Sequence, residues 1–247
     1  MKTAKQFIFI GFLFIKINLL AQVTRVIYKY QYYDLEATEK SFKENKDNAP
    51  DYVLKIVREN FEKSFKKEYE LVYDKSKAIF FKTNSISSGN FDIKDNDVYY
   101  KNLPKNEKIY QTNFVSKKTN VIIKFHQYDW QITNETKFIS GYKCFKATLQ
   151  ESKSVIIGQE EFFYKRFVWF TPEIPASFGP QGFDGLPGLV LETAENDKLC
   201  LRAVKIEFNL DKNIKIEKPV ASKSIKLDEF EAIEKENFKK MQDEMGN

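Results

Sequence analysis

The hydrophobic pattern changes period early in the chain. Val26, Tyr28, Tyr30 and Tyr32 recur at every second position, and this alternation predicts a strand. Between residues 50 and 67 the apolar side chains fall instead on one helical face. A proline near the start and an acid in the first turn favour helix initiation. We predict a helix of about 16 residues there.

From residue 69 onward the pattern returns to short strands separated by polar gaps. The predicted strands are 69–73, 78–82, 98–103, 108–115, 120–125, 130–132, 137–140, 142–149, 161–171, 189–193 and 198–209. Residues 161–171 are apolar on both faces apart from Lys165 and Arg166, which predicts one central strand. Gly141 predicts a bulge or a close backbone approach. Helical spacing reappears at residues 227–243.

This order of elements indicates a mainly β (α+β) protein. Many strands at short spacing favour an antiparallel sheet, curved or closed into a half-barrel or sandwich. One helix belongs to the N-terminal half and one to the C-terminus. The length after the first 21 residues suits a single β-rich domain, residues 22–247, with its C-terminal helix at about 227–243.

The first 21 residues have the pattern of a signal peptide. Lys2 and Lys5 precede an apolar run from Phe7 to Leu20, and Ala21 offers a small residue for cleavage. The run is short for a membrane span, although a retained N-terminal anchor is the alternative. We therefore expect export to the periplasm or the extracellular space, with no transmembrane segment after the signal is removed.

Charge gives no evidence for a polyanionic partner. The formal net charge of the chain is +5. Removal of residues 1–21 removes three lysines and no acid, so the mature charge is 5 − 3 = +2. Acidic and basic residues are interspersed, and nothing in this balance indicates nucleic acid or an acidic membrane as a partner.

Cys144 and Cys200 are the only cysteines. In an exported protein such a pair suggests a disulfide. Two buried, reduced thiols on strands are the alternative, because the sequence does not show whether the two Cα atoms are close enough.

The most unusual stretch of the chain is rich in glycine and proline. The chain has 9 glycines and 7 prolines, and four of each fall between residues 172 and 188. They are Gly179, Gly182, Gly185 and Gly188 with Pro172, Pro175, Pro180 and Pro187. Such a cluster fixes an irregular backbone path. Either this loop presents backbone donors to a ligand or partner, or it is a structural turn that Phe178, Phe183, Leu186 and Leu189 hold on the core.

The same loop carries a family resemblance. Gly185, Leu186, Pro187, Gly188, Leu189 and Val190 resemble the signature of the GLPGLI family, with Val190 in place of the final isoleucine. The stretches 130–132, 136–137, 139–144 and 146–147 resemble the segment before that signature, and 169–171, 173–175 and Gly179-Pro180 resemble the approach to it. The resemblance covers roughly residues 95–205. It implies an exported, β-rich protein of Bacteroidota without established activity.

Motifs for catalysis or metal binding are weak. His126 is the only histidine, and no nucleophile elbow accompanies it. The cysteines lack zinc-ligand spacing, and the acids at 92, 95 and 97 lack the spacing of a calcium loop. Glu160, Glu161 and Glu173 are the acids that a carboxylate-dependent hydrolase would use. The sequence predicts no catalytic residue, no metal site and no cofactor.

Three hypotheses for function follow. The first is a non-enzymatic binding or interaction domain of the cell envelope, with an outer-membrane protein as a candidate partner. The second is a carrier of a hydrophobic ligand, because the predicted architecture resembles the half-barrels of lipoprotein carriers, a likeness of fold alone. The third is the carboxylate-dependent hydrolase, which requires two acids in one pocket.

Overall fold

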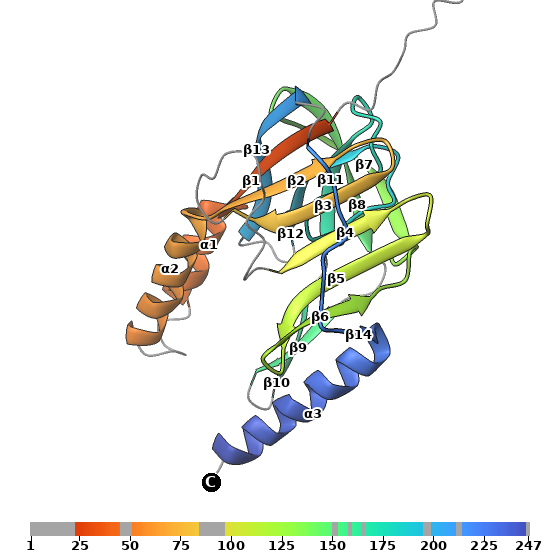
Figure 1. Ribbon diagram of the computed structural model, residues 1–247. Coiled ribbons are helices and arrows are strands. Elements are labelled where there is room, and N and C mark those ends of the chain that lie inside the picture. Colours follow the sequence, from red (N-terminus) through yellow and green to blue (C-terminus); the bar gives the residue numbers. More distant parts are fainter. Residues whose placement is uncertain are drawn as a thin grey trace, which may run out of the picture.

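The fold is dominated by one large, open β-sheet. The computed structural model describes residues 23–44, 51–83, 97–149, 153–157, 160–164, 166–194, 199–210 and 214–245. In these residues a sheet of twelve strands curves around a core, and a separate two-stranded hairpin and three helices accompany it (Figure 1). The predicted signal peptide, residues 1–21, lies outside the described residues.

The elements follow one another with short connections. In chain order they are β1 (Val23–Tyr32), α1 (Leu35–Glu44), α2 (Asp51–Phe65), β2 (Glu68–Tyr73), β3 (Lys77–Lys82), β4 (Val98–Asn102), β5 (Glu107–Phe114), β6 (Lys117–Ile122), β7 (Trp130–Ile139), β8 (Tyr142–Leu149), β9 (Lys153–Ile157), β10 (Glu160–Tyr164), β11 (Phe167–Thr171), the 3₁₀ turn η2 (Pro180–Gly182), β12 (Leu189–Ala194), β13 (Leu199–Leu210), β14 (Lys223–Lys226) and α3 (Leu227–Met245).

The sheet is mainly antiparallel. Its strand order is β14-β6-β5-β4-β3-β2-β1-β13-β12-β11-β8-β7, so β1 lies in the middle and pairs with both β2 and β13. The only parallel pair among the described strands joins β14 to β6. The sheet does not close, and the predicted class of a curved sheet or half-barrel is confirmed.

The two predicted helices are present as α2 and α3. Near the start of α3, Phe230 is buried between Tyr110 and Phe114, at ring-centroid distances of 6.2 and 4.8 Å. The helix α1 was not predicted, since its two strongly apolar residues are Leu35 and Phe42. The carboxylate of Asp34 accepts a hydrogen bond from the backbone N–H of Ala37 at 2.8 Å and caps this helix.

Three local predictions were wrong. Residues 161–171 do not form one central strand, because β10 pairs with β9 in the small hairpin and only β11 enters the large sheet. Residues 130–139 form one strand where two were predicted, and its register is irregular between Ile132 and Thr136. Gly141 lies in a tight hairpin turn at φ +86°, with no atom within 4 Å of the site of a Cβ. The sequence pattern reports only local preferences. Where a strand begins and ends depends on the strands that it pairs with, which the pattern does not show.

The main core lies on the inside of the curve. Val26, Tyr28, Leu71 and Phe80 from the first three strands meet Trp169, Leu189 and Leu191 from β11 and β12 in one buried cluster. The connection between β11 and β12, residues 172–188, reaches as far as Tyr99 of β4 and Lys108 of β5. Four strands separate β4 from β12 in the sheet. This connection therefore crosses the inside of the sheet and fills it.

Candidate functional site

Glycines fix the path of the loop at two positions where a side chain has no room. A Cβ on Gly188 would lie 2.2 Å from the carbonyl oxygen of Thr171, and a Cβ on Gly179 would lie 2.0 Å from that of Phe183. Gly185 has φ +92° but open space around it. The family-like motif thus uses its glycines for two different reasons: close approach at residues 179 and 188, and backbone conformation at 185.

Apolar side chains hold the loop against the core. Phe178, Phe183, Leu186 and Leu189 are all buried, each at most 3% exposed. The hydroxyl of Tyr28 donates a hydrogen bond of 2.6 Å to the carbonyl oxygen of Val190. Of the two alternatives from the sequence, the burial of these four side chains fits the structural turn.

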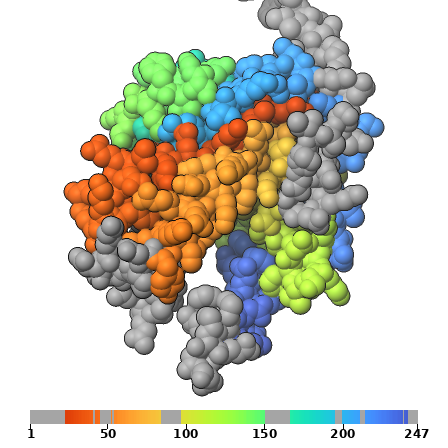
Figure 2. Space-filling model, turned by 90° about the vertical axis from the view of Figure 1, so that its left-hand side faces the viewer, coloured from red at the N-terminus to blue at the C-terminus, as the bar shows by residue number. Residues whose placement is uncertain are grey.

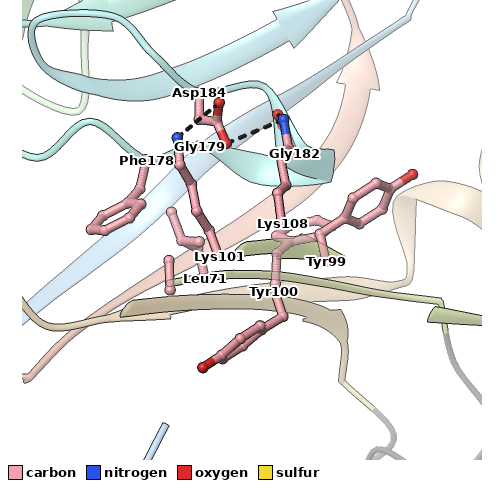
Figure 3. Close-up of a pocket in the computed structure, with 11 residues that line it drawn as sticks. Leu71, Tyr99, Tyr100, Lys101, Lys108, Phe178, Gly179, Gly182 and Asp184 are labelled. Atoms are coloured by element: carbon pink, nitrogen blue, oxygen red, sulfur yellow. Dashed lines mark hydrogen bonds and ion pairs between the residues drawn. The ribbon is translucent and has the colours of Figure 1, made fainter. Parts of the chain in front are cut away.

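A buried carboxylate provides the polar contacts of the loop. Asp184 forms ion pairs with Lys101 of β4 at 3.1 Å and with Lys108 of β5 at 3.3 Å (Figure 3). The three side chains are 6%, 8% and 2% exposed. The pairs join the loop to two neighbouring strands on the opposite side of the interior. Since both oxygens of Asp184 have a cationic partner, the carboxylate determines where the loop sits.

Lys108 has a full set of partners. Besides Asp184, its ammonium donates to the carbonyl oxygen of Gly182 at 2.7 Å and to the side-chain oxygen of Gln127 at 3.1 Å. It also lies 4.7 Å from the ring centre of Tyr128. Burial lowers the pKa of Lys108 to about 8, with a smaller lowering effect of Lys101, against the raising effect of Asp184.

The space left under the loop is very small. A cavity of about 20 Å³ lies between the stems of Lys101 and Lys108, beside Phe178, Gly179 and Gly182 (Figure 3). That volume suits about one water molecule. Pockets for small-molecule ligands usually measure about 300–1,000 Å³. The interior beneath the loop is therefore packed and offers no room for a lipid chain.

A second buried carboxylate lies in the strand that follows the loop. Glu192 of β12 is fully buried and forms ion pairs with Lys137 of β7, at 2.6 Å, and with Arg202 of β13. The ammonium of Lys137 also lies 4.4 Å from the ring centre of Trp169. Glu192 joins strands on both sides of β12, much as Asp184 joins the loop to β4 and β5.

The two cysteines are free and buried. Cys144 lies on β8 and Cys200 on β13, and two strands, β11 and β12, separate them. With strands about 4.8 Å apart, the thiols lie far beyond the Cα separation that a disulfide requires. Of the two alternatives from the sequence, the structure has the reduced pair. Burial raises the pKa of Cys144 to about 12 and that of Cys200 to about 11.

The other candidate residues are not brought together. Glu173 is exposed and accepts a hydrogen bond from the backbone N–H of Lys143 at 3.0 Å. His126 is exposed, edge-on to the ring of Phe125. Within the described residues, no group of three or more His, Cys, Asp or Glu side chains is placed to hold a metal ion. The side chains of Glu160 and Glu161, like residues 92 and 95, lie outside what the structure describes.

Sequence reasoning missed the two buried acids. Asp184 stands between Phe183 and Gly185, and Glu192 between Leu191 and Thr193, in stretches that are otherwise apolar. A single acid within an apolar stretch could have indicated a buried ion pair, since a buried carboxylate requires a partner. The sequence could not identify that partner, because the partner comes from a distant part of the chain.

Comparison with known proteins gives a short family match and a likeness of fold. Residues 156–192, which include the loop and Glu192, match the model of a family described as "Protein of unknown function (Porph_ging)". Two solved structures of PNGF-II are similar, one in space group C2 (16% identity, TM-score 0.52) and one in P2₁ (15%, 0.51). None of the curated proteins matches the chain.

The likeness to PNGF-II is limited in extent. It covers 86% of this chain but 32% and 33% of the PNGF-II chains, so this chain spans about a third of their length. At such identity it shows the fold alone. The fold and site define a β-rich protein with a curved, open sheet and a filled interior, and its loop-bearing segment matches a family of unknown function. Of the described helices, none combines the length and the apolar character needed to span a bilayer.

Proposed function

We propose that this chain is an exported protein of the GLPGLI family that serves as a non-enzymatic binding or interaction domain at the cell envelope. One observation carries the proposal: the loop at residues 172–188 occupies the inside of the curved sheet, anchored by Asp184. A protein with a filled interior recognises partners through its outer surface. The resemblance of residues 185–190 to the family signature and the match of residues 156–192 support the family.

The carrier hypothesis receives less support. A hydrophobic ligand inside the sheet requires the loop to leave, because the cavity of about 20 Å³ is too small. Departure of the loop would separate Asp184 from two buried lysines and expose Phe178 and Phe183. Both changes are costly in free energy.

The hydrolase hypothesis also receives less support. Asp184 and Glu192 each have two cationic partners, and Glu173 lies in solvent. The side chains of Glu160 and Glu161, the other two acids of this hypothesis, lie outside what the structure describes. A carboxylate-dependent hydrolase instead needs two acids facing a substrate pocket.

Native mass spectrometry of the mature protein, purified without detergent from an exporting host, tests the proposal. We expect the mass of the polypeptide alone. A lipid or peptide that survives purification in a fixed stoichiometry would overturn the filled-interior argument and restore the carrier.

Export is tested on the full-length gene product. We expect the protein in the periplasm or medium with Gln22 at its N-terminus, because Ala21 is the small residue before the expected cleavage point. Replacing two apolar residues of the run at 7–20 by aspartate should retain the protein in the cytoplasm. Unchanged localisation of that variant would contradict the signal-peptide assignment.

A further inference from the structure

The strand β7 ends the sheet on one side. No described strand pairs with its outer edge, and β8 is its only partner in the sheet. In Figure 2 the green surface of β7 and β8 forms the upper-left margin of the molecule, beside the blue surface of β13. An edge strand presents backbone N–H and C=O groups that another extended chain can pair with.

Only part of this edge is regular. The register slips between Ile132 and Thr136, and such irregularities twist an edge away from pairing. From Thr136 to Ile139 the pairing with β8 is continuous as far as the turn at Ser140 and Gly141. The usable edge is therefore the short stretch Thr136–Ile139.

This stretch is held rigidly. The hydroxyl of Ser140 donates to the carbonyl oxygen of Ala203 at 2.9 Å, which ties the hairpin turn to β13. Lys137 is fixed by Glu192 at 2.6 Å, and the backbone N–H of Lys143 donates to Glu173. A preordered edge loses little conformational entropy when a partner adds to it.

The exposed chemistry of the edge is aromatic and cationic. The side chain of Phe138 is 74% exposed, and Lys143 lies directly opposite it on β8. Lys137 and Lys143 are the only charged residues between positions 136 and 145. Lys137 is paired with the buried Glu192, and Glu135, just before this stretch, is paired with Lys146. The ammonium of Lys143 forms no ion pair among the described residues and lies 5.6 Å from the ring centre of Phe145.

We propose that an extended, acidic segment of a partner protein adds as a further strand along Thr136–Ile139. Backbone hydrogen bonds supply its affinity, Phe138 contacts its apolar side chains, and Lys143 pairs with its acids. This proposal specifies the class of partner and the binding surface of the interaction domain proposed above. It rests on that proposed function. A second copy of this chain fits less well, because pairing two such edges brings the Lys143 side chains of both copies together without an acid from residues 136–145.

The test uses the mature chain, labelled with ¹⁵N, and two synthetic peptides, (Glu-Val)₄ and (Lys-Val)₄. We expect the acidic peptide to perturb the amides of residues 136–139 and to bind at least about tenfold more tightly than the basic one. Phe138→Ser should weaken binding by about tenfold. Val115→Ser is the matched control, since Val115 is 71% exposed in the turn between β5 and β6, far along the sheet order from β7.

Three outcomes of the peptide experiment overturn the proposal. Equal affinity for the two peptides removes the charge argument, and perturbation away from the edge, or no binding, removes the site. A concentration-dependent dimer that Phe138→Ser abolishes assigns the edge to a second copy. A lipid found by native mass spectrometry would instead overturn the proposed function and leave the peptide result standing.

Discussion

At the scale of single residues, two carboxylates organise the segment that the family model matches. Asp184 and Glu192 are buried, and each contacts two cations from different strands. Buried pairs of this kind add little stability compared with apolar packing, but they are costly to break. Their effect is to define one position for the loop and one for β12.

Asp184→Asn should lower the free energy of unfolding by about 3 kcal/mol or more, because it leaves two buried lysines without a counter-charge. Urea unfolding measures the loss. Glu173→Gln is the control, since Glu173 is exposed and its change should stay within about 0.5 kcal/mol. Similar losses in the two variants would show that burial of the charge is unimportant.

Lys108 should make stability depend on alkaline pH. Burial lowers its pKa from 10.5 to about 8 in the folded protein. Below pH 8 Lys108 is protonated in both the folded and the unfolded protein, so the cost of burying its charge lowers the free energy of unfolding in full. Between pH 8 and 10.5 the unfolded chain binds more protons, so the free energy of unfolding rises with pH, by at most about 1.4 kcal/mol per unit.

The measurement is the difference in unfolding free energy between the wild type and Lys108→Met from pH 7 to 9. Taking the difference cancels the contributions of groups that are present in both proteins, such as the cysteines. Because their pKa values are raised in the folded protein, the cysteines lower the free energy of unfolding as the pH rises above 9. We expect the difference to change in favour of the wild type above pH 8. Parallel curves would mean that Lys108 stays charged.

At the scale of elements, the loop between β11 and β12 behaves as part of the core. Its apolar side chains are buried, and its glycines lie where the backbone touches Thr171 and Phe183. The motif thereby specifies a shape that fits the inside of the sheet.

Gly188→Ala should destabilise the protein by more than about 2 kcal/mol, because its Cβ would lie 2.2 Å from a backbone oxygen that cannot move easily. Gly185→Ala should cost about 1 kcal/mol, since only the positive φ of +92° opposes it. The midpoints of urea unfolding show which of the two variants is less stable. A reversed order would contradict the assignment of glycine roles.

The sequence predicted the elements better than their connections. The alternation at 26–32 and the helical spacing at 50–67 repeat over several residues, so β1 and α2 were recovered. The break between Tyr164 and Phe167 was missed, because both halves are apolar and only their partners differ. For the site, anchoring of the loop by Phe178 and Phe183 was one of two alternatives from the sequence. The sequence could not predict that Lys101 and Lys108 meet Asp184, which lies more than seventy positions away.

At the scale of the whole molecule, strand order decides which residues meet. The first strand pairs with the last long strand, β13, so the middle of the sheet joins residues 23–32 to residues 199–210. The same order keeps β8 and β13 apart and with them the two cysteines.

Both thiols should therefore remain reduced and unreactive in the folded protein. We expect Ellman's reagent at pH 8 to detect no thiol in the native protein and two per chain after unfolding without reductant. The raised pKa values of Cys144 and Cys200 add to the protection by burial. If unfolding released no thiol, the cysteines would be oxidised and the strand order incompatible with that state.

The far end of the sheet differs from the β7 edge in a way that limits assembly. There β14 has only four residues, with a lysine at each end, and it leads directly into α3. A strand added beyond β14 would meet α3 at Leu227, whereas the outer edge of β7 has no described helix beside it in the chain. We therefore expect added strands at the β7 edge only. Any complex built by this route stops at a defined stoichiometry and cannot polymerise into a fibre, because one end of every molecule terminates the stack.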